Sequence, residues 1–250
     1  MTEPERGDLV ILPDPAALAE EVARRFVELA QAAVADHGRF TVALSGGSTP
    51  RALYQLLAQP PLSEAVDWAN VHVYWGDERM VPPDDPESSY RMARETLLAH
   101  VPIPAANIYP APTVGGTAEA AASAYQETLT ATFGSGSPRF DLILLGIGPD
   151  GHTASLFPGQ PEVVRPSNAL VAAVHNAPKP PPARITFTYE LINAAANVLF
   201  VVSGDDKAAA LREVLRGPAD PARLPAQGVR PKNGALVWLV DAAVGGSLKR

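Results

Sequence analysis

The sequence has no cysteine and only five histidines among its 250 residues. A disulfide framework, a thiolate metal site and a cysteine nucleophile are therefore excluded, and the histidines lack the spacing of a zinc site. No apolar run approaches the roughly 18 residues of a membrane-spanning helix. The N-terminus also lacks a signal-like basic and apolar segment. We therefore expect a cytoplasmic protein with no metal and no membrane partner.

Positive charge is sparse as well. Charged residues make up 19% of the chain and the net charge is -7, with no dense cluster of lysine or arginine. This balance argues against a nucleic-acid partner, so an anionic ligand must be bound by local positive groups. Hydrophobic residues make up 46%, which is usual for a folded globular protein. We expect a single domain over residues 1–250 that is a monomer or a weak homodimer.

Short apolar segments alternate with helix-like segments along the chain. The clearest helix, at residues 16–35, has apolar side chains at three- and four-residue spacing. Alternation of strands and helices predicts an α/β fold with a parallel sheet. The segments with the apolar and β-branched character of buried strands are residues 8–12, 40–44, 71–75, 140–145, 198–202 and 236–240.

One of these strands opens the stretch at residues 140–159, FDLILLGIGPDGHTASLFPG. In open α/β sheets ligands bind beyond the carboxyl ends of the strands, so we expect the polar residues of this turn to lie in a site. Asp150 and His152 are the candidates for chemistry. A histidine in a turn flanked by glycines cannot be buried by its own element, and imidazole, with an ordinary pKa near 6.5, is suited to general-base catalysis.

The glycines of this turn, Gly146, Gly148 and Gly151, have the spacing G-x-G-x-x-G of dinucleotide-binding proteins. Such a site also needs a long helix that begins in the motif and an acidic residue about 20 positions later. A Pro-Gly pair interrupts the chain at residues 158–159, and no acidic residue ends the next strand. Nucleotide binding is therefore not predicted. The serines near the turns lack the G-x-S-x-G pattern of a hydrolase nucleophile.

A second glycine-rich turn, Ser45-Gly46-Gly47-Ser48-Thr49-Pro50, follows the predicted strand at residues 40–44 and precedes a helical segment. Free backbone N–H groups and the positive end of the helix dipole would make it an anion cradle, although a simple capped turn is the alternative. It is not a P-loop, because no Gly-Lys-Ser/Thr follows.

Charged residues follow two further strands. Asp77, Glu78 and Arg79 come directly after the segment at residues 71–75, where they form either a solvent-exposed loop or part of a site. Lys207 lies in the first helical turn after residues 198–202, where the helix dipole disfavours a positive charge. That conflict suggests a bound anion beside Lys207.

Four separated motifs resemble those of the 6-phosphogluconolactonase family, part of the wider glucosamine-6-phosphate deaminase/isomerase-like superfamily. They are LSGGSTP at residues 44–50, GDERMVP at 76–82, LGIGPDGHTASLFPG at 145–159, and RIT at 184–186 together with SGDDK at 203–207. A closing W-x-x-D at Trp238 and Asp241 also matches. In one departure, Ser88-Ser89 stands where the lactonase pattern usually has Ser-Asn.

This resemblance implies hydrolysis of 6-phospho-D-glucono-1,5-lactone to 6-phospho-D-gluconate in the oxidative pentose phosphate pathway. It also implies a Rossmann-like parallel sheet flanked by helices, with a smaller appended α/β lobe. No metal or cofactor is implied. The expected ligand is a small sugar-phosphate lactone.

On this basis His152 is expected to act as the base that activates water, oriented by Asp150 or Asp77. Arg79, or backbone N–H groups of the turn at residues 146–151, would stabilise the oxyanion. The phosphate would bind at the cradle and be held by two cationic side chains. The expected phosphate-binding residues are Ser45, Gly46, Gly47, Ser48, Thr49, Arg184 and Lys207.

Two alternatives remain at this point. An aldose-ketose isomerase or deaminase acting on an amino-sugar phosphate would use the same cradle and histidine, with Asp77 as an additional base. A non-catalytic sugar-phosphate sensor would need an attached DNA-binding segment, and we expect none.

Overall fold

The computed structural model describes residues 6–134, 138–161 and 168–249. Within these residues the strands form a six-stranded sheet in the order β1-β9-β8-β5-β2-β3 and a three-stranded sheet in the order β4-β7-β6. All strand pairs of the larger sheet are parallel. Its strands are β1 (Asp8–Leu12), β2 (Phe40–Leu44), β3 (Val71–Trp75), β5 (Leu142–Leu145), β8 (Asn197–Val202) and β9 (Ala235–Asp241). The expected Rossmann-like parallel sheet is thus confirmed.

The central strands are buried on both faces, as their unbroken apolar sequences predicted. Every residue of β2 and of β5 is buried. Alternate side chains along these strands point to opposite faces, and those of one face, such as Ala43 and Ile143, belong to one apolar cluster. Those of the other face, such as Val42 and Leu142, belong to a second cluster. Helices must therefore cover both faces of the sheet.

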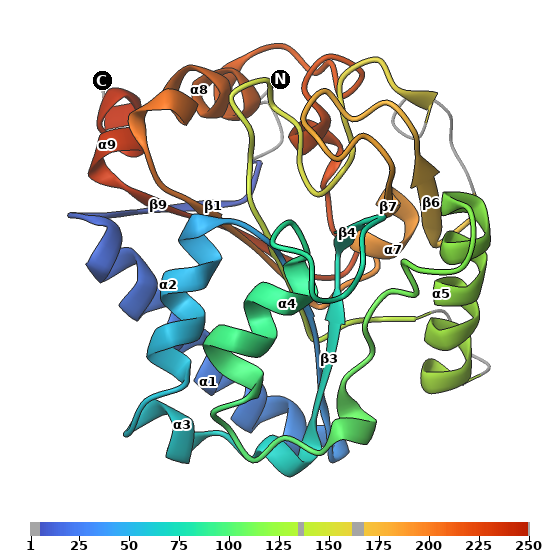
Figure 1. Cartoon of the computed structure of the whole chain (residues 1–250). Helices are drawn as coiled ribbons and strands as arrows, with labels where there is room; N and C mark the ends of the chain where they lie inside the picture. The colour runs from blue at the N-terminus through green and yellow to red at the C-terminus, as the bar shows by residue number, and fades with distance from the viewer. Residues whose placement is uncertain (1–5, 135–137, 162–167, 250) are drawn as a thin grey trace.

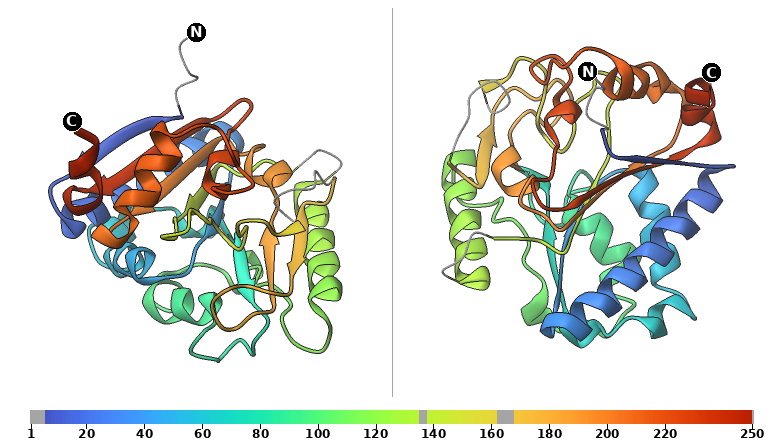
Figure 2. Two further views of the ribbon diagram at one scale, coloured as in Figure 1. Left: turned by 90° about the horizontal axis from the view of Figure 1, so that it is seen from above. Right: turned by 180° about the vertical axis from the view of Figure 1, so that it is seen from behind.

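Figures 1 and 2 show the two helical layers. One face is covered by α1 (Pro15–His37), α2 (Ser48–Leu57), α3 (Leu62–Ala65) and α4 (Ser89–Ala93), after which one turn of π-helix (Arg94–Leu98) continues the segment. The other face is covered by α5 (Ala118–Phe133), α7 (Tyr189–Ile192), α8 (Ala208–Arg216) and α9 (Ala242–Gly245). Among the residues described, none of the helices combines the length and the apolar character that a membrane span requires.

The predicted long helix has a cap at each end. The side chain of Asp14 caps α1 by accepting a hydrogen bond from the amide of Ala17 at 2.8 Å. Gly38 ends the helix in the left-handed conformation, with φ of 82°, which glycine adopts at little cost. Leu18, Val22 and Phe26 are fully buried along the face that packs on the sheet.

The smaller lobe contains the antiparallel sheet of β4 (Asp77–Arg79), β7 (Arg184–Phe187) and β6 (Val171–Val174), packed beside α5 (Figure 1). Residues 77–79 therefore form a strand, and the alternative of a solvent-exposed loop is wrong. Three charged residues in a row do not have the apolar pattern of a strand. The strand forms because it pairs with β7, which lies more than 100 residues later in the sequence. Glu78 is only 2% exposed.

The strand order brings the candidate turns together. β8, β5, β2 and β3 are consecutive neighbours in the larger sheet. Because they are parallel, the turns that follow them lie at the same edge. Since β4 continues directly from β3 into the smaller lobe, this edge also faces β7. A site here is built from both sheets.

Candidate active site

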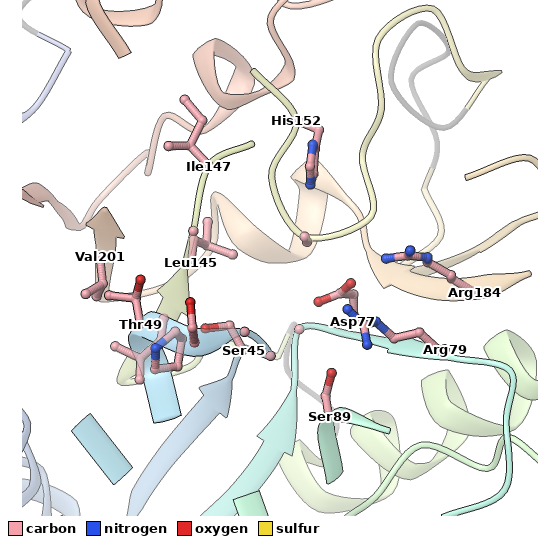
Figure 3. A pocket seen from close by; sticks show the side chains of 18 of the residues that line it. Ser45, Thr49, Asp77, Arg79, Ser89, Leu145, Ile147, His152, Arg184 and Val201 are labelled. Atoms are coloured by element: carbon pink, nitrogen blue, oxygen red, sulfur yellow. The ribbon is translucent and has the colours of Figure 1, made fainter. Parts of the chain in front are cut away.

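A cavity of about 200 Å³ lies at this edge of the sheet (Figure 3). Every residue predicted for the site except Asp150 lines it, including the cradle, His152 and Lys207. The structure therefore joins the turns after β2, β3, β5 and β8 with Arg184 of β7. The wall also contains Gly146 and Ile147 of the turn considered for the oxyanion. Residues that the sequence reasoning did not select complete it, namely Pro50, Gly76, Ser89, Leu144, Leu145, Ala154 and Val201.

The cradle presents free backbone donors at the start of α2. Gly47 precedes the helix with φ of 111°, a conformation that a larger residue rarely adopts, and no side chain caps the helix. Tyr54 fixes the turn, because its hydroxyl accepts from the amide of Ser45 at 3.1 Å and donates to the carbonyl of Ser45 at 2.9 Å. The uncapped N–H groups and the helix dipole can bind a phosphate.

His152 and Asp150 form a hydrogen-bonded pair. Nδ1 of His152 lies 2.5 Å from Oδ1 of Asp150, and the backbone amide of His152 donates to the same oxygen at 3.2 Å. Burial acts to raise the pKa of Asp150. The hydrogen bond and the charge of His152 outweigh burial and hold this pKa below its usual value. With Nδ1 engaged in this way, Nε2 of His152 is the nitrogen left for chemistry in the cavity.

The turn that carries His152 depends on glycine. The amide of Gly148 donates to the carbonyl of His152, and that of Gly151 to the carbonyl of Gly148, both at 2.9 Å. A Cβ on Gly148 would lie 2.1 Å from the imidazole, so only glycine lets the ring occupy this position. Gly151 has φ of 80°. Gly148 of the motif thus makes room for the imidazole, and Gly151 provides the left-handed turn just before His152.

The ring of Phe157 contacts two of the candidate site residues, His152 and Arg184. Its ring lies 4.6 Å from the imidazole of His152, centroid to centroid. The guanidinium of Arg184 lies 5.6 Å from the same ring, within the range of a cation–π contact. Phe157 therefore links the position of the candidate base to that of a candidate anion-binding residue.

Asp77 lines the cavity but contacts a different partner. Its Oδ2 accepts a hydrogen bond from the buried hydroxyl of Ser155 at 2.7 Å. Of the two acids considered for orienting His152, Asp150 is the one that hydrogen-bonds the imidazole. Figure 3 places Asp77 next to Arg79, so its charge lies among those of the two arginines of the smaller lobe.

Arg79 is held in place while part of its guanidinium stays free. Its Nη1 donates to the carbonyl of Glu87 and lies 3.7 Å from the Glu87 carboxylate. Its Nε is buried and has no hydrogen-bond partner among the described residues. A ligand in the cavity can therefore accept from Arg79 without breaking an existing bond.

Arg184 is 5% exposed, and burial lowers its pKa below the usual value, against the opposing charge of Asp77. Its Nε donates to the carbonyl of Pro181 at 3.0 Å and its Nη2 to that of Lys179 at 2.9 Å. In Figure 3 Arg184 lies on the same side of the cavity as Arg79, opposite Thr49. The buried guanidinium is therefore a fixed positive charge at the end of the cavity remote from Thr49.

Lys207 reaches the cavity from the turn after β8. It ends a 3₁₀ turn (Asp205–Lys207), and its Nζ donates to Asp206 at 2.9 Å. Asp241 braces this turn by accepting from the hydroxyl of Ser203 at 2.6 Å and from the amide of Gly204 at 3.3 Å. The W-x-x-D motif at the end of β9 thus has a structural use, which is to fix the loop that carries the lysine.

Glu78 was not selected from the sequence, yet it organises one wall of the cavity. Its carboxylate accepts from the amides of Arg79 and Ser89 at 2.9 Å and from that of Tyr90 at 2.8 Å. Burial raises the pKa of Glu78, with these hydrogen bonds acting in the opposite direction. A buried glutamate among charged neighbours leaves no periodic signal, so only the structure reveals it.

In the described parts of the chain, no group of three or more histidine or acidic side chains is arranged to hold a metal ion. The donors that converge on the cavity are cationic side chains, hydroxyls and backbone amides. Such a set suits an anionic, polyhydroxylated ligand.

Comparison with known proteins identifies the family. The model of glucosamine-6-phosphate isomerases/6-phosphogluconolactonase matches residues 13–238. The chain is 42% identical over 241 residues to a 6-phosphogluconolactonase of Nostoc sp., covering 95% of this chain and 97% of the relative. It is 44% identical over 220 residues to a 6-phosphogluconolactonase of Synechocystis sp., covering 87% and 88% respectively.

The structure agrees with these sequences. The solved 6-phosphogluconolactonase of Trypanosoma brucei superposes with a TM-score of 0.87 at 30% identity, covering 97% of this chain and 98% of the other. The chain therefore belongs to the family of glucosamine-6-phosphate isomerases and 6-phosphogluconolactonases.

Proposed function

We propose that the chain is an esterase of the pentose phosphate pathway that hydrolyses 6-phospho-D-glucono-1,5-lactone to 6-phospho-D-gluconate. The observation that carries this proposal is the pairing of one oriented imidazole with an anion cradle in a single cavity. Relatives that carry the lactonase name align over nearly the whole chain. The substrate is a ring ester, so one base and one oxyanion donor suffice for water to attack it.

In the proposed reaction, Nε2 of His152 removes a proton from water as the oxygen adds to the C1 carbonyl. The ring C–O bond then breaks, and the imidazolium returns the proton to the departing ring oxygen. Asp150 holds the imidazole through Nδ1 and stabilises its charged form. The products are a carboxylic acid and an alcohol within one molecule, with no covalent enzyme intermediate.

Arg79 is the group we assign to the oxyanion. The alternative donors, the backbone amides of the turn at residues 146–151, are partly occupied, since those of Gly148 and Gly151 already donate within the turn. Arg79 lines the same cavity as His152, and its buried Nε lacks a partner among the residues described. A fixed cation beside the carbonyl stabilises the charge that develops on its oxygen.

The phosphate is assigned to the cradle of Ser45 to Thr49, with Lys207 as one cationic partner. Arg184 is assigned as the second, acting on the phosphate from across the cavity, since it lies opposite Thr49. Support comes from the uncapped start of α2 and from the position of both cations on the cavity wall. The backbone amides supply directed donors, while the side chains supply charge.

The isomerase and deaminase reactions of the same family are the second candidate. They require a further carboxylate base, and Asp77 is available in the cavity. Here, however, Oδ2 of Asp77 already accepts a hydrogen bond from the hydroxyl of Ser155 at 2.7 Å, so this oxygen is engaged with the protein. This contact favours the hydrolytic assignment.

A pH-stat experiment separates the two activities. Acid release from freshly prepared 6-phosphogluconolactone should exceed the spontaneous rate in proportion to protein concentration. Ammonia release from glucosamine 6-phosphate, followed in parallel, should stay at background. Ammonia release with no acceleration of lactone hydrolysis would reject the proposal in favour of the deaminase.

A further inference from the structure

The cavity concentrates buried polar groups that have no partner. Within the part of the chain that the structure describes, five buried side-chain atoms lack a hydrogen bond, and three belong to residues that line the cavity. They are Ser45 Oγ, Arg79 Nε and Ser89 Oγ. Buried polar groups are nearly always paired, so an unpaired cluster indicates groups that a ligand satisfies. Ser45 and Arg79 are already assigned, whereas Ser89 is not.

Ser89 begins α4 and is 2% exposed. Its side chain lies against the cradle, since a Cβ on Gly46 would come within 2.4 Å of its Oγ. Figure 3 shows the Ser89 side chain directed into the cavity, on the side of Asp77 and Arg79 and away from Thr49. The hydroxyl therefore lies between the cradle and the proposed oxyanion donor.

The neighbouring serine shows what a purely structural hydroxyl does at this point. Ser88 Oγ donates to Glu78 and accepts from the amide of Arg91, both at 3.1 Å, and so caps α4. Ser89 contributes only its amide to this network. Its hydroxyl is therefore not needed to cap the helix or to fix the loop.

Glu78 fixes the backbone at Ser89, although the Ser89 hydroxyl itself makes no hydrogen bond among the described residues. The Glu78 carboxylate accepts hydrogen bonds from two consecutive backbone amides, those of Ser89 and Tyr90. Backbone anchoring of this kind fixes the direction of the side chain before a ligand arrives. Ser89 is thus a preorganised donor and acceptor on the cavity wall.

We propose that the hydroxyl of Ser89 hydrogen-bonds a hydroxyl group of the bound sugar and that Ser89 determines specificity for the lactone. This inference rests on the proposed function. A hydroxyl both donates and accepts, which matches another hydroxyl, whereas a phosphate needs donors alone. The phosphate is already provided with backbone amides and cations, so the sugar is the part of the substrate that faces Ser89.

The test compares Ser89→Ala with the wild type on the parent lactone and on its 2-, 3- and 4-deoxy analogues. Ser89→Ala should lower kcat/KM for the parent by about tenfold, as expected for one lost hydrogen bond. On the analogue that lacks the contacted hydroxyl, the two proteins should have equal kcat/KM. An equal loss on every analogue, or no loss on the parent, overturns the proposal.

Calorimetry supplies a readout that does not depend on turnover. Ser89→Ala should weaken binding of 6-phosphogluconate and leave binding of inorganic phosphate unchanged, whereas equal weakening of both would overturn the assignment to the sugar. If the wild type fails to hydrolyse the lactone, the proposed function itself fails, and the two failures are thereby distinguished.

Ser88→Ala is the matched control. It removes a cap and should lower the melting temperature, while its discrimination among the deoxy lactones should stay like that of the wild type. Ser89→Ala should show the reverse, with a melting temperature equal to or above that of the wild type, because it removes an unpaired buried hydroxyl. A lower melting temperature together with unchanged discrimination in Ser89→Ala would assign Ser89 a structural role instead.

Discussion

Nδ1 of His152 lies 2.5 Å from Oδ1 of Asp150, two residues earlier in the same glycine-rich turn. This contact determines which nitrogen of the imidazole carries the proton. A carboxylate only accepts hydrogen bonds, so it selects the form in which Nδ1 is protonated and Nε2 is free to take a proton.

Asp150→Asn should therefore lower kcat by roughly 10²-fold or more with little change in KM. The amide of asparagine can donate to Nδ1 and so favour the imidazole form with its proton on Nε2, which cannot act as a base. Steady-state kinetics measure the effect. The melting temperature is the control and should change little, because the Asp150 side chain is 40% exposed. Activity equal to that of the wild type would show that Asp150 does not orient the base.

Gly148→Ala tests the packing of the same histidine. The added Cβ would lie 2.1 Å from the imidazole and 2.7 Å from the Asp150 carboxylate, so the ring must move. We expect a fall in kcat of roughly 10²-fold, since a displacement of about 1 Å has an effect of that size. Gly246→Ala is the control, because a Cβ there meets nothing within 4 Å. Equal kcat in both variants would contradict the assigned position of His152.

Lys207→Ala should raise KM with kcat nearly unchanged, because a residue that only holds the phosphate binds ground state and transition state alike. Lys232→Ala is a matched control, since that lysine is 67% exposed on the surface. Arg184→Ala should behave as Lys207→Ala does. A fall confined to kcat in the arginine variant would instead place Arg184 at the lactone end of the substrate.

Glu78→Gln tests the buried carboxylate. In the variant, the NH2 group of glutamine would replace a carboxylate oxygen that accepts hydrogen bonds from backbone amides. Because two donors would then face each other, we expect a loss of about 2 kcal/mol or more in the free energy of unfolding. Burial raises the pKa of Glu78 above 4.5, so between that value and the raised pKa the folded protein binds the proton more strongly than the unfolded chain does. The stability of the wild type relative to Glu78→Gln should therefore fall as pH rises through this interval.

Chemical denaturation at a series of pH values measures this difference. As a control, the difference in free energy of unfolding between the wild type and Glu78→Gln should no longer change with pH at values well above the interval. A difference that grows with rising pH would mean that the hydrogen bonds to the carboxylate outweigh its burial.

Much of the fold was predictable because its signals are local. The unbroken apolar strands of the larger sheet, the capped helix α1 and the turn at residues 45–50 depend on neighbouring residues in the sequence. The Asp150–His152 pair is local too, since both residues lie in one turn.

The features that escaped prediction depend on contacts between distant segments. β4 is a strand only because β7 pairs with it, and nothing in the charged sequence of β4 indicates that partner. Ser89 joins the cavity because α4 packs beside the cradle at Gly46, and Phe157 matters because it lies beneath Arg184. Such contacts follow from the packing of the two sheets, which no sequence period encodes.

The kinetics of His152→Ala on 6-phosphogluconolactone test the central claim most directly. The wild type should accelerate hydrolysis above the spontaneous rate, and the variant should lose roughly 10²-fold or more in kcat while its KM stays close to that of the wild type. Full activity in His152→Ala would contradict the assignment of His152 as the base that activates water.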